Sequence, residues 1–224
     1  MAKTARKPRT SPAETARITE IFTRLKSHDE DPRTELDYSS PYTLVTAVAL
    51  SAQATDVGVN KATARLFPVA DTPEKMLELG EDGLIPNIAS IGLFRTKARN
   101  VIAAARIIME QHGGEVPLNR ADLMALPGVG RKTASVVLNE LGIEPAIAVD
   151  THVFRLAHRL KLSAGKTPDL VEADLMAVVP EPFLTRAHHW LILHGRYVCV
   201  ARRPKCEECV ISDLCPSRML FIGS

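Results

Sequence analysis

Apolar residues recur every three or four positions along most of the chain, and no segment alternates apolar and polar residues for long. The first pattern is typical of amphipathic helices, whereas half-buried strands would show the second. Ser, Thr, Asn or Asp, often followed by Pro, precedes many periodic segments and suits the cap and first position of a helix. We therefore predict an all-α fold, with helices that begin near residues 12, 41, 55, 73, 84, 97, 119, 131, 150, 168 and 184. Gly80 is predicted to end the helix that begins at Pro73.

A short segment, LPGVGRKT at residues 126–133, separates two of the predicted helices. Pro127 cannot continue the first helix, and Gly128 and Gly130 tolerate positive φ and let another molecule approach the backbone. The amides of this turn precede the second helix, where unpaired N–H groups and the positive end of the helix dipole favour an anion. The segment therefore predicts a helix-turn-helix that binds phosphate.

Two cations, Arg131 and Lys132, open the second helix of this motif and oppose its dipole, at a cost of about 0.3–1 kcal/mol each. Their placement favours a functional role, because an arginine suits a phosphate and a lysine amine can act as a nucleophile. The alternative is an ordinary turn followed by a solvated lysine. Asp150 presents a similar choice, since a carboxylate at a helix start is commonly only an N-cap, worth about 1 kcal/mol.

The length and charge of the chain set limits on its organisation. Its 224 residues suit two compact lobes, and its formal net charge of +2 does not by itself indicate nucleic-acid binding. Basic residues nevertheless gather in an amino-terminal tail without acidic residues, at one predicted helix start and among the cysteines. These clusters are Lys3, Arg6, Lys7 and Arg9; Arg95, Lys97 and Arg99; and Arg202, Arg203 and Lys205.

No apolar run approaches the length of a membrane span, and the amino-terminal tail lacks the hydrophobic region of a secretory signal. We therefore expect an intracellular protein. All four cysteines lie close together in the spacing C-x6-C-x2-C-x5-C, at Cys199, Cys206, Cys209 and Cys215. In a reducing compartment this clustering favours metal ligation over disulfides.

Four thiolates serve either a tetrahedral zinc ion or an iron–sulfur cluster, and both interpretations remain open from the residues alone. The spacing matches neither zinc-ribbon pairs nor the usual ferredoxin runs. Because four cysteines already complete a ligand shell, we expect the nearby histidines to lie outside it, as packing residues or as neighbours of the ligands. These histidines are His188, His189 and His194.

Other stretches join the cysteine pattern: LSAQATDVGVNKATA at 50–64, IGLF at 91–94, LPGVGRKTASVV at 126–137, AVDTHVFR at 148–155 and HHWLILHGRYVC at 188–199. Together they resemble the helix-hairpin-helix DNA glycosylases, over about residues 16–215. The resemblance implies an enzyme of base excision repair. Such an enzyme removes oxidised pyrimidines from duplex DNA and then acts as a lyase, cutting the strand at the abasic site by β-elimination.

The resemblance also implies roles for individual residues. Lys132 would attack the sugar and form a Schiff base, and Asp150 would activate the lysine or stabilise positive charge on the sugar. Gln53 and Leu93 match the residues that fill the gap left by a flipped-out nucleotide. In this family the four cysteines hold a 4Fe–4S cluster. The remaining DNA contacts would be Gly128, Val129, Gly130, Arg131, His152, Arg202, Arg203 and Lys205.

We expect two helical lobes with a DNA groove between them, one over residues 34–144 and the other over 1–33 with 145–224. The first would hold the helix-hairpin-helix and the second the iron–sulfur loop. The protein would act as a monomer on damaged or abasic duplex DNA, in the bacterial cytoplasm at the nucleoid and away from membranes. Two alternatives are a monofunctional adenine or mismatch glycosylase of the same superfamily, which generally lacks the lysine, and a non-catalytic DNA-binding module. The second leaves the pair of Lys132 and Asp150 unexplained.

Overall fold

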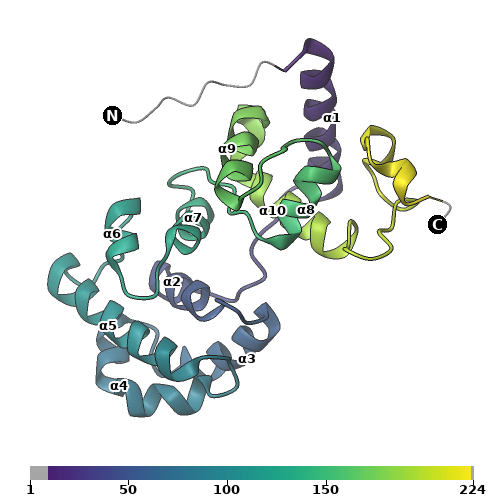
Figure 1. Cartoon of the computed structure of the whole chain (residues 1–224). Coiled ribbons are helices and arrows are strands. Elements are labelled where there is room, and N and C mark those ends of the chain that lie inside the picture. Colours follow the sequence, from purple (N-terminus) through teal and green to yellow (C-terminus); the bar gives the residue numbers. More distant parts are fainter. Residues whose placement is uncertain (1–9, 223–224) are drawn as a thin grey trace. The chain divides into compact units, whose positions relative to one another are not determined.

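The computed structural model describes residues 10–222, and helices are the only regular elements in that range (Figure 1). The predicted all-α fold is therefore confirmed. The basic tail residues Lys3, Arg6, Lys7 and Arg9 lie outside the described residues. None of the helices seen in residues 10–222 is both long and apolar enough to cross a membrane. The α-helices are α1 (Pro12–His28), α2 (Pro41–Leu50), α3 (Asp56–Leu66), α4 (Pro73–Ile88), α5 (Phe94–His112), α6 (Arg120–Ala125), α7 (Arg131–Glu140), α8 (Thr151–Arg159), α9 (Pro168–Val178) and α10 (Leu184–Tyr197).

Capping side chains define most of the helix starts. Each cap accepts a hydrogen bond from an amide in the first helical turn, and proline occupies the start of α1, α2, α4 and α9. Both features follow from the local sequence, which explains why these starts were predictable. The capping residues are Ser11, Ser40, Thr55, Thr72, Asn119, Asp150 and Thr167.

The described residues divide into two compact units. The first is Thr34–Glu144 and holds α2 to α7, and the second combines the residues up to Arg33 with those from Pro145 onward. Each unit has its own apolar core. In the first unit α2 is central: Leu44, Ala47 and Leu50 are fully buried, and the helix contacts α3, α5 and α7.

The predicted helix end at Gly80 is confirmed, because the backbone is non-helical there, with φ 64° and ψ 177°, and a second helical segment of α4 continues beyond this kink to Ile88. Two other predictions about the first unit are wrong. Helix α5 begins at Phe94 and not near Lys97, since Leu93 turns the chain with a left-handed φ of 59°. Lys97 itself is buried, and desolvation lowers the pKa of its amine. It therefore adds nothing to the basic surface predicted at this helix start.

Three aromatic rings pack against one another in the second unit. Phe22 of α1 stacks on Phe183, with the ring centroids 5.9 Å apart, and Trp190 of α10 packs edge-on against Phe183. The indole Nε1 of Trp190 donates to the carbonyl oxygen of Asp29, at 2.8 Å, just beyond the end of α1. Packing and a hydrogen bond together therefore hold α10 against α1.

Helices α8 and α10 also belong to this unit and approach closely at Gly195. A Cβ added to Gly195 would lie 2.9 Å from the carbonyl oxygen of His152 and 3.1 Å from its carbonyl carbon. Those atoms are backbone and cannot move aside without shifting the first turn of α8. Only glycine therefore suits this position.

Gly195→Ala is expected to destabilise the protein by about 1–3 kcal/mol, the usual cost of overpacking. Urea denaturation followed by circular dichroism measures the difference. Gly92→Ala is a matched control, because the nearest atom to a Cβ on Gly92 is the carbonyl oxygen of Gln53 at 3.9 Å. Equal stability of the two variants would show that the close approach at Gly195 is not a constraint.

Candidate active site and metal centre

The turn between α6 and α7 is built on two glycines with different roles. Gly128 has φ 83°, and a Cβ there would lie 3.1 Å from the Cβ of Asn100. Both its left-handed backbone and its close neighbour therefore favour glycine. Gly130 is extended, with φ −87° and ψ 178°, and it begins α7 without a side-chain cap. No neighbouring atom lies within 4 Å of a Cβ on Gly130, so a ligand can approach this end of the helix.

The three amides predicted to contact phosphate are not equivalent. The Val129 amide donates to the carbonyl oxygen of Leu126 at 3.0 Å and closes the turn, and the Val129 side chain is buried in the core. The amides of Gly128 and Gly130 donate to no other backbone group within the described residues. Val129 thus holds the shape of the turn, and the two glycine amides remain available to an anion.

Arg131 and Lys132 form the first turn of α7, and both side chains are exposed. Within residues 10–222, the Lys132 amine has neither an ion pair nor a hydrogen bond. An unpaired cation in the first turn of a helix is electrostatically unfavourable. The exposed amine of Lys132 therefore does not stabilise α7.

Asp150 is the N-cap of α8, in the second unit. Its Oδ1 accepts hydrogen bonds from the amides of His152 and Val153, both at 2.8 Å. The capping role proposed as an alternative is therefore real, but it uses only one carboxylate oxygen. The cap fixes the orientation of the half-buried carboxylate, while Oδ2 takes no part in it.

The side chain of His152 is engaged with the end of α10. Its Nδ1 lies 3.4 Å from the carbonyl oxygen of Gly195 and 3.3 Å from Nη2 of Arg155. Arg155 donates to the carbonyl oxygens of Gly195, at 2.5 Å, and Cys199, at 3.0 Å. These bonds connect the helix capped by Asp150 to the first cysteine. Nothing in the local sequence indicates the contacts with Gly195 and Cys199, because those two residues lie at least 40 positions further along the chain.

Gln53 and Leu93, the predicted gap-filling residues, lie on two neighbouring turns of the first unit. A Cβ on Gly92 would lie 3.9 Å from the carbonyl oxygen of Gln53. Both residues have left-handed backbone, with φ 56° and 59°, and both are exposed, Leu93 to 62%. An exposed leucine on strained backbone is uncommon and is better explained by a binding role than by core packing.

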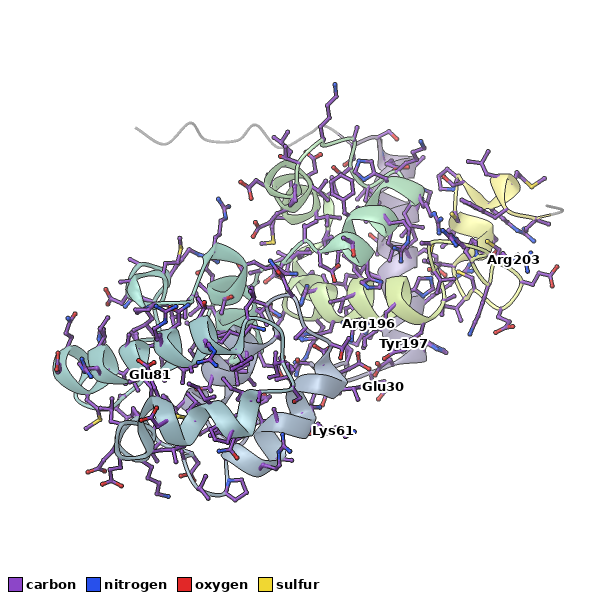
Figure 2. The ribbon with its side chains drawn as sticks, turned by 60° about the horizontal axis from the view of Figure 1, so that its bottom comes forward. Glu30, Lys61, Glu81, Arg196, Tyr197 and Arg203 are labelled. Atoms are coloured by element: carbon purple, nitrogen blue, oxygen red, sulfur yellow. The ribbon has the colours of Figure 1, made fainter. Side chains whose placement is uncertain are left out.

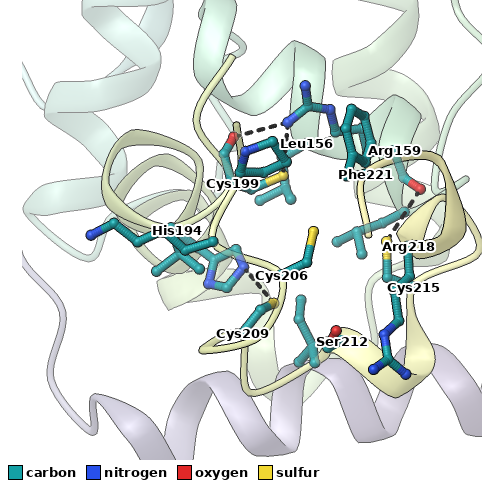
Figure 3. A pocket seen from close by; sticks show the side chains of 15 residues that line it. Leu156, Arg159, His194, Cys199, Cys206, Cys209, Ser212, Cys215, Arg218 and Phe221 are labelled. Carbon is teal, nitrogen blue, oxygen red and sulfur yellow. Dashed lines mark hydrogen bonds between the residues drawn. The ribbon is translucent and has the colours of Figure 1, made fainter. Parts of the chain in front are cut away.

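The four cysteines follow α10 and line one cavity (Figure 3). Within residues 10–222, no three His, Cys, Asp or Glu side chains converge closely enough to hold a single metal ion. Thiols spread around a cavity suit a cluster of several atoms better than one tetrahedral zinc ion. The donor set therefore fits an iron–sulfur cluster.

The surroundings of this cavity explain why its thiols need a metal to ionise. Burial raises the pKa of Cys209 to about 11, and burial also raises the pKa of Cys206 and of Cys215. Iron would bind them as thiolates, because a coordinating thiol loses its proton. His194, which was expected outside the ligand shell, lies beside Cys209, with Nε2 3.4 Å from Sγ. Burial lowers the pKa of His194 to about 4, so its ring is neutral at physiological pH.

The loop that carries the cysteines is basic on its outside. Arg202, Arg203 and Lys205 are all exposed, and Figure 2 shows Arg203 on this loop. Arg203 has a left-handed φ of 54°, and the proline that follows it, Pro204, further restricts its backbone. The loop therefore holds its basic side chains toward solvent.

Comparisons with known proteins match both regions. The model of the HhH-GPD superfamily base excision DNA repair proteins matches residues 46–181, and that of the iron–sulfur binding domain of endonuclease III matches residues 199–215. Endonuclease III of Escherichia coli strain K12 is 58% identical over 200 residues, covering 89% of this chain and 95% of that protein. Endonuclease III of Haemophilus influenzae is 58% identical over 196 residues, covering 88% and 93%. The structure of a trapped endonuclease III–DNA covalent intermediate aligns with a TM-score of 0.84 and 40% identity, covering 92% and 97%.

The hairpin and the helical fold thus define a class of protein: the chain belongs to the HhH-GPD superfamily of base excision DNA repair proteins. Within that superfamily it belongs to the endonuclease III family. It is therefore a DNA-binding repair enzyme, a DNA glycosylase and lyase, and it carries a 4Fe–4S cluster. The resemblance found in its motifs is confirmed.

Asp150→Ala is expected to lower the free energy of unfolding by about 1 kcal/mol, because it removes the acceptor for two amides of α8. Asp150→Asn should remain within a few tenths of a kcal/mol of the parent, since Asn caps a helix as well as Asp does. Urea titrations of both variants measure this difference. Equal losses in the two would contradict it, because they would trace to the lost charge and not to the cap.

Proposed function

We propose that this enzyme removes oxidised pyrimidines from duplex DNA and cuts the strand at the resulting abasic site, with Lys132 as nucleophile and Asp150 as its carboxylate partner. The observation that carries the proposal is the exposed, unpaired amine of Lys132 directly after the glycine turn. A phosphate bound at the start of α7 would bring the neighbouring sugar toward this amine.

The chemistry follows from one amine and one carboxylate acting on the same sugar. The lone pair of the Lys132 nitrogen forms a bond to C1′ while the bond from C1′ to the base breaks. The base leaves with the electrons of that broken bond and takes up a proton. Ring opening then gives a protonated Schiff base. Loss of a C2′ proton expels the 3′ phosphate oxygen by β-elimination, and water releases the lysine. Asp150 stabilises positive charge on the sugar and accepts a proton from the amine.

The base must leave the helical stack before it can be excised, and the gap must be filled. The exposure of Leu93 and its neighbouring turn at Gln53 support these roles. An apolar wedge suits the face of a neighbouring base, and a side-chain amide suits the edge of the base that has lost its partner.

The remaining contacts would hold the phosphate backbone without reading sequence. In the hairpin these are the amides of Gly128 and Gly130 and the side chain of Arg131, while Val129 supports the turn. His152 would contribute Nε2, because its contacts with Gly195 and Arg155 involve only Nδ1.

A second set of contacts would come from the basic side chains of the cysteine loop, Arg202, Arg203 and Lys205. The 4Fe–4S cluster, held by Cys199, Cys206, Cys209 and Cys215, would cross-link that loop. We further propose that the protein acts as a monomer on damaged or abasic DNA at the nucleoid of the bacterial cytoplasm.

Lys132→Ala is expected to reduce borohydride trapping on a duplex with one oxidised pyrimidine at least ~100-fold, because no amine remains to form the Schiff base. Duplex binding should persist. Lys61→Ala is the control, since Lys61 is an exposed lysine on α3 (Figure 2). Full trapping in Lys132→Ala would refute the assignment of the nucleophile. If the parent enzyme releases a free base but is not trapped, it is a monofunctional glycosylase. If the parent binds the duplex and does neither, it is a DNA-binding module.

Leu93→Ala is expected to slow excision of a paired lesion about 10-fold or more, because the flipped nucleotide loses the group that replaces it in the stack. Cutting of a preformed abasic site should fall less, since that nucleotide has no base to unstack. Single-turnover assays on the two substrates separate the effects. Leu118→Ala, at a leucine that is 48% exposed, is the matched control. An equal loss on both substrates would argue against a wedge.

A further inference from the structure

His194 has a contact that the proposed glycosylase chemistry does not use. It lies in the last turn of α10 and is 7% exposed. Its ring nitrogen Nε2 is 3.4 Å from Sγ of Cys209. Figure 3 marks this contact with a dashed line. Nε2 can donate to a thiolate sulfur if the ring is the tautomer that carries its proton there.

Arg159 makes a similar contact on another cysteine. Its Nη1 lies 3.3 Å from Sγ of Cys199 and 2.7 Å from the carbonyl oxygen of Val200, and its Nη2 donates to the carbonyl oxygen of Ala201 at 2.9 Å. The guanidinium also stacks over the ring of Phe221, with Cζ 4.4 Å from the ring centroid. Arginine has donors and no acceptor, so its contact with the sulfur must be a donated hydrogen bond. The surrounding bonds hold that donor in place.

We propose that His194 and Arg159 are positioning residues of the iron–sulfur centre, donating N–H···S hydrogen bonds to the thiolates of Cys209 and Cys199 and so favouring the more reduced state of the cluster. A donor near a ligand sulfur stabilises the state with more negative charge, and the low dielectric of a buried site strengthens this effect. Hydrogen bonds to metal ligands commonly tune a centre in this way. The proposal concerns the cluster alone and is independent of the role of Lys132.

His194 borders two cavities, so its side chain also separates the cysteine cavity from its surroundings. Together with Val198 it lines both the cysteine cavity and a second cavity, which Trp190 and Tyr197 also line. Removing the whole side chain would therefore bring solvent closer to the cluster as well as delete the donor. His194→Phe keeps an aromatic ring there without a donor, and His194→Gln keeps a donor.

The test is the one-electron midpoint potential of the cluster, measured by film voltammetry on full-length protein with matched iron content. His194→Phe is expected to shift it to more negative values, lowering the reduced-to-oxidised ratio at a fixed potential severalfold. A tenfold change corresponds to about 59 mV for a one-electron couple. His194→Gln should recover part of the shift, and Arg159→Met should shift the potential in the same direction. His188→Phe is the control, because His188 is buried on the same helix but does not line the cysteine cavity.

An unchanged potential in His194→Phe with full iron content would overturn the proposal. If that variant fails to assemble the cluster, the parent protein still provides a test. With histidine labelled by nitrogen-15, pulsed electron paramagnetic resonance of the paramagnetic cluster should detect a weakly coupled histidine nitrogen. Its absence would refute the contact with Cys209.

Discussion

The crossing of α8 and α10 at Gly195 is the constraint on which the second unit depends. The two helices meet backbone to backbone, because a Cβ on Gly195 would lie 2.9 Å from the carbonyl oxygen of His152. This proximity lets Arg155 bond both Gly195 and the carbonyl oxygen of Cys199. The helix that Asp150 caps and the loop that holds the cluster are therefore parts of one packed body. A change that makes the cluster loop more mobile should therefore also make the Asp150 carboxylate, which we assign to catalysis, more mobile.

Three of the proposed DNA contacts lie on backbone that costs energy to maintain. Among the described residues, four that are not glycine have positive φ: Gln53, Leu93, Lys161 and Arg203. Three of these four are residues that the family resemblance assigns to DNA. The left-handed conformation costs a residue with a side chain roughly 1–2 kcal/mol, so neighbouring packing must sustain it. A strained turn held by rigid helices keeps an exposed side chain in one orientation, as a wedge or a phosphate contact requires.

The sequence predicted features that are decided locally and missed those that depend on tertiary contacts. Ser40 and Thr72 mark helix starts because a cap bonds within one turn, and the glycine hairpin and the cysteine spacing are equally local. The burial of Lys97 and the donors beside the cysteine sulfurs arise only when distant helices pack. Arg159 and Cys199, for example, are 40 residues apart. The start of α5 was misplaced for a different reason: leucine rarely adopts the left-handed conformation that Leu93 has. Of the two candidate catalytic residues, Lys132 stands out by its placement in the first turn of a helix, whereas Asp150 is assigned through motif resemblance, since alone it is only a good cap.

The residue that becomes bonded to DNA tests the central claim most directly. Borohydride reduction of the parent enzyme on a damaged duplex, followed by nuclease and protease digestion, leaves a sugar fragment on one peptide for tandem mass spectrometry. We predict that the added mass maps to Lys132, and that trypsin no longer cleaves after it. A fragment on another lysine or on the amino terminus would contradict the account, even if the enzyme still excises the base and cuts the strand.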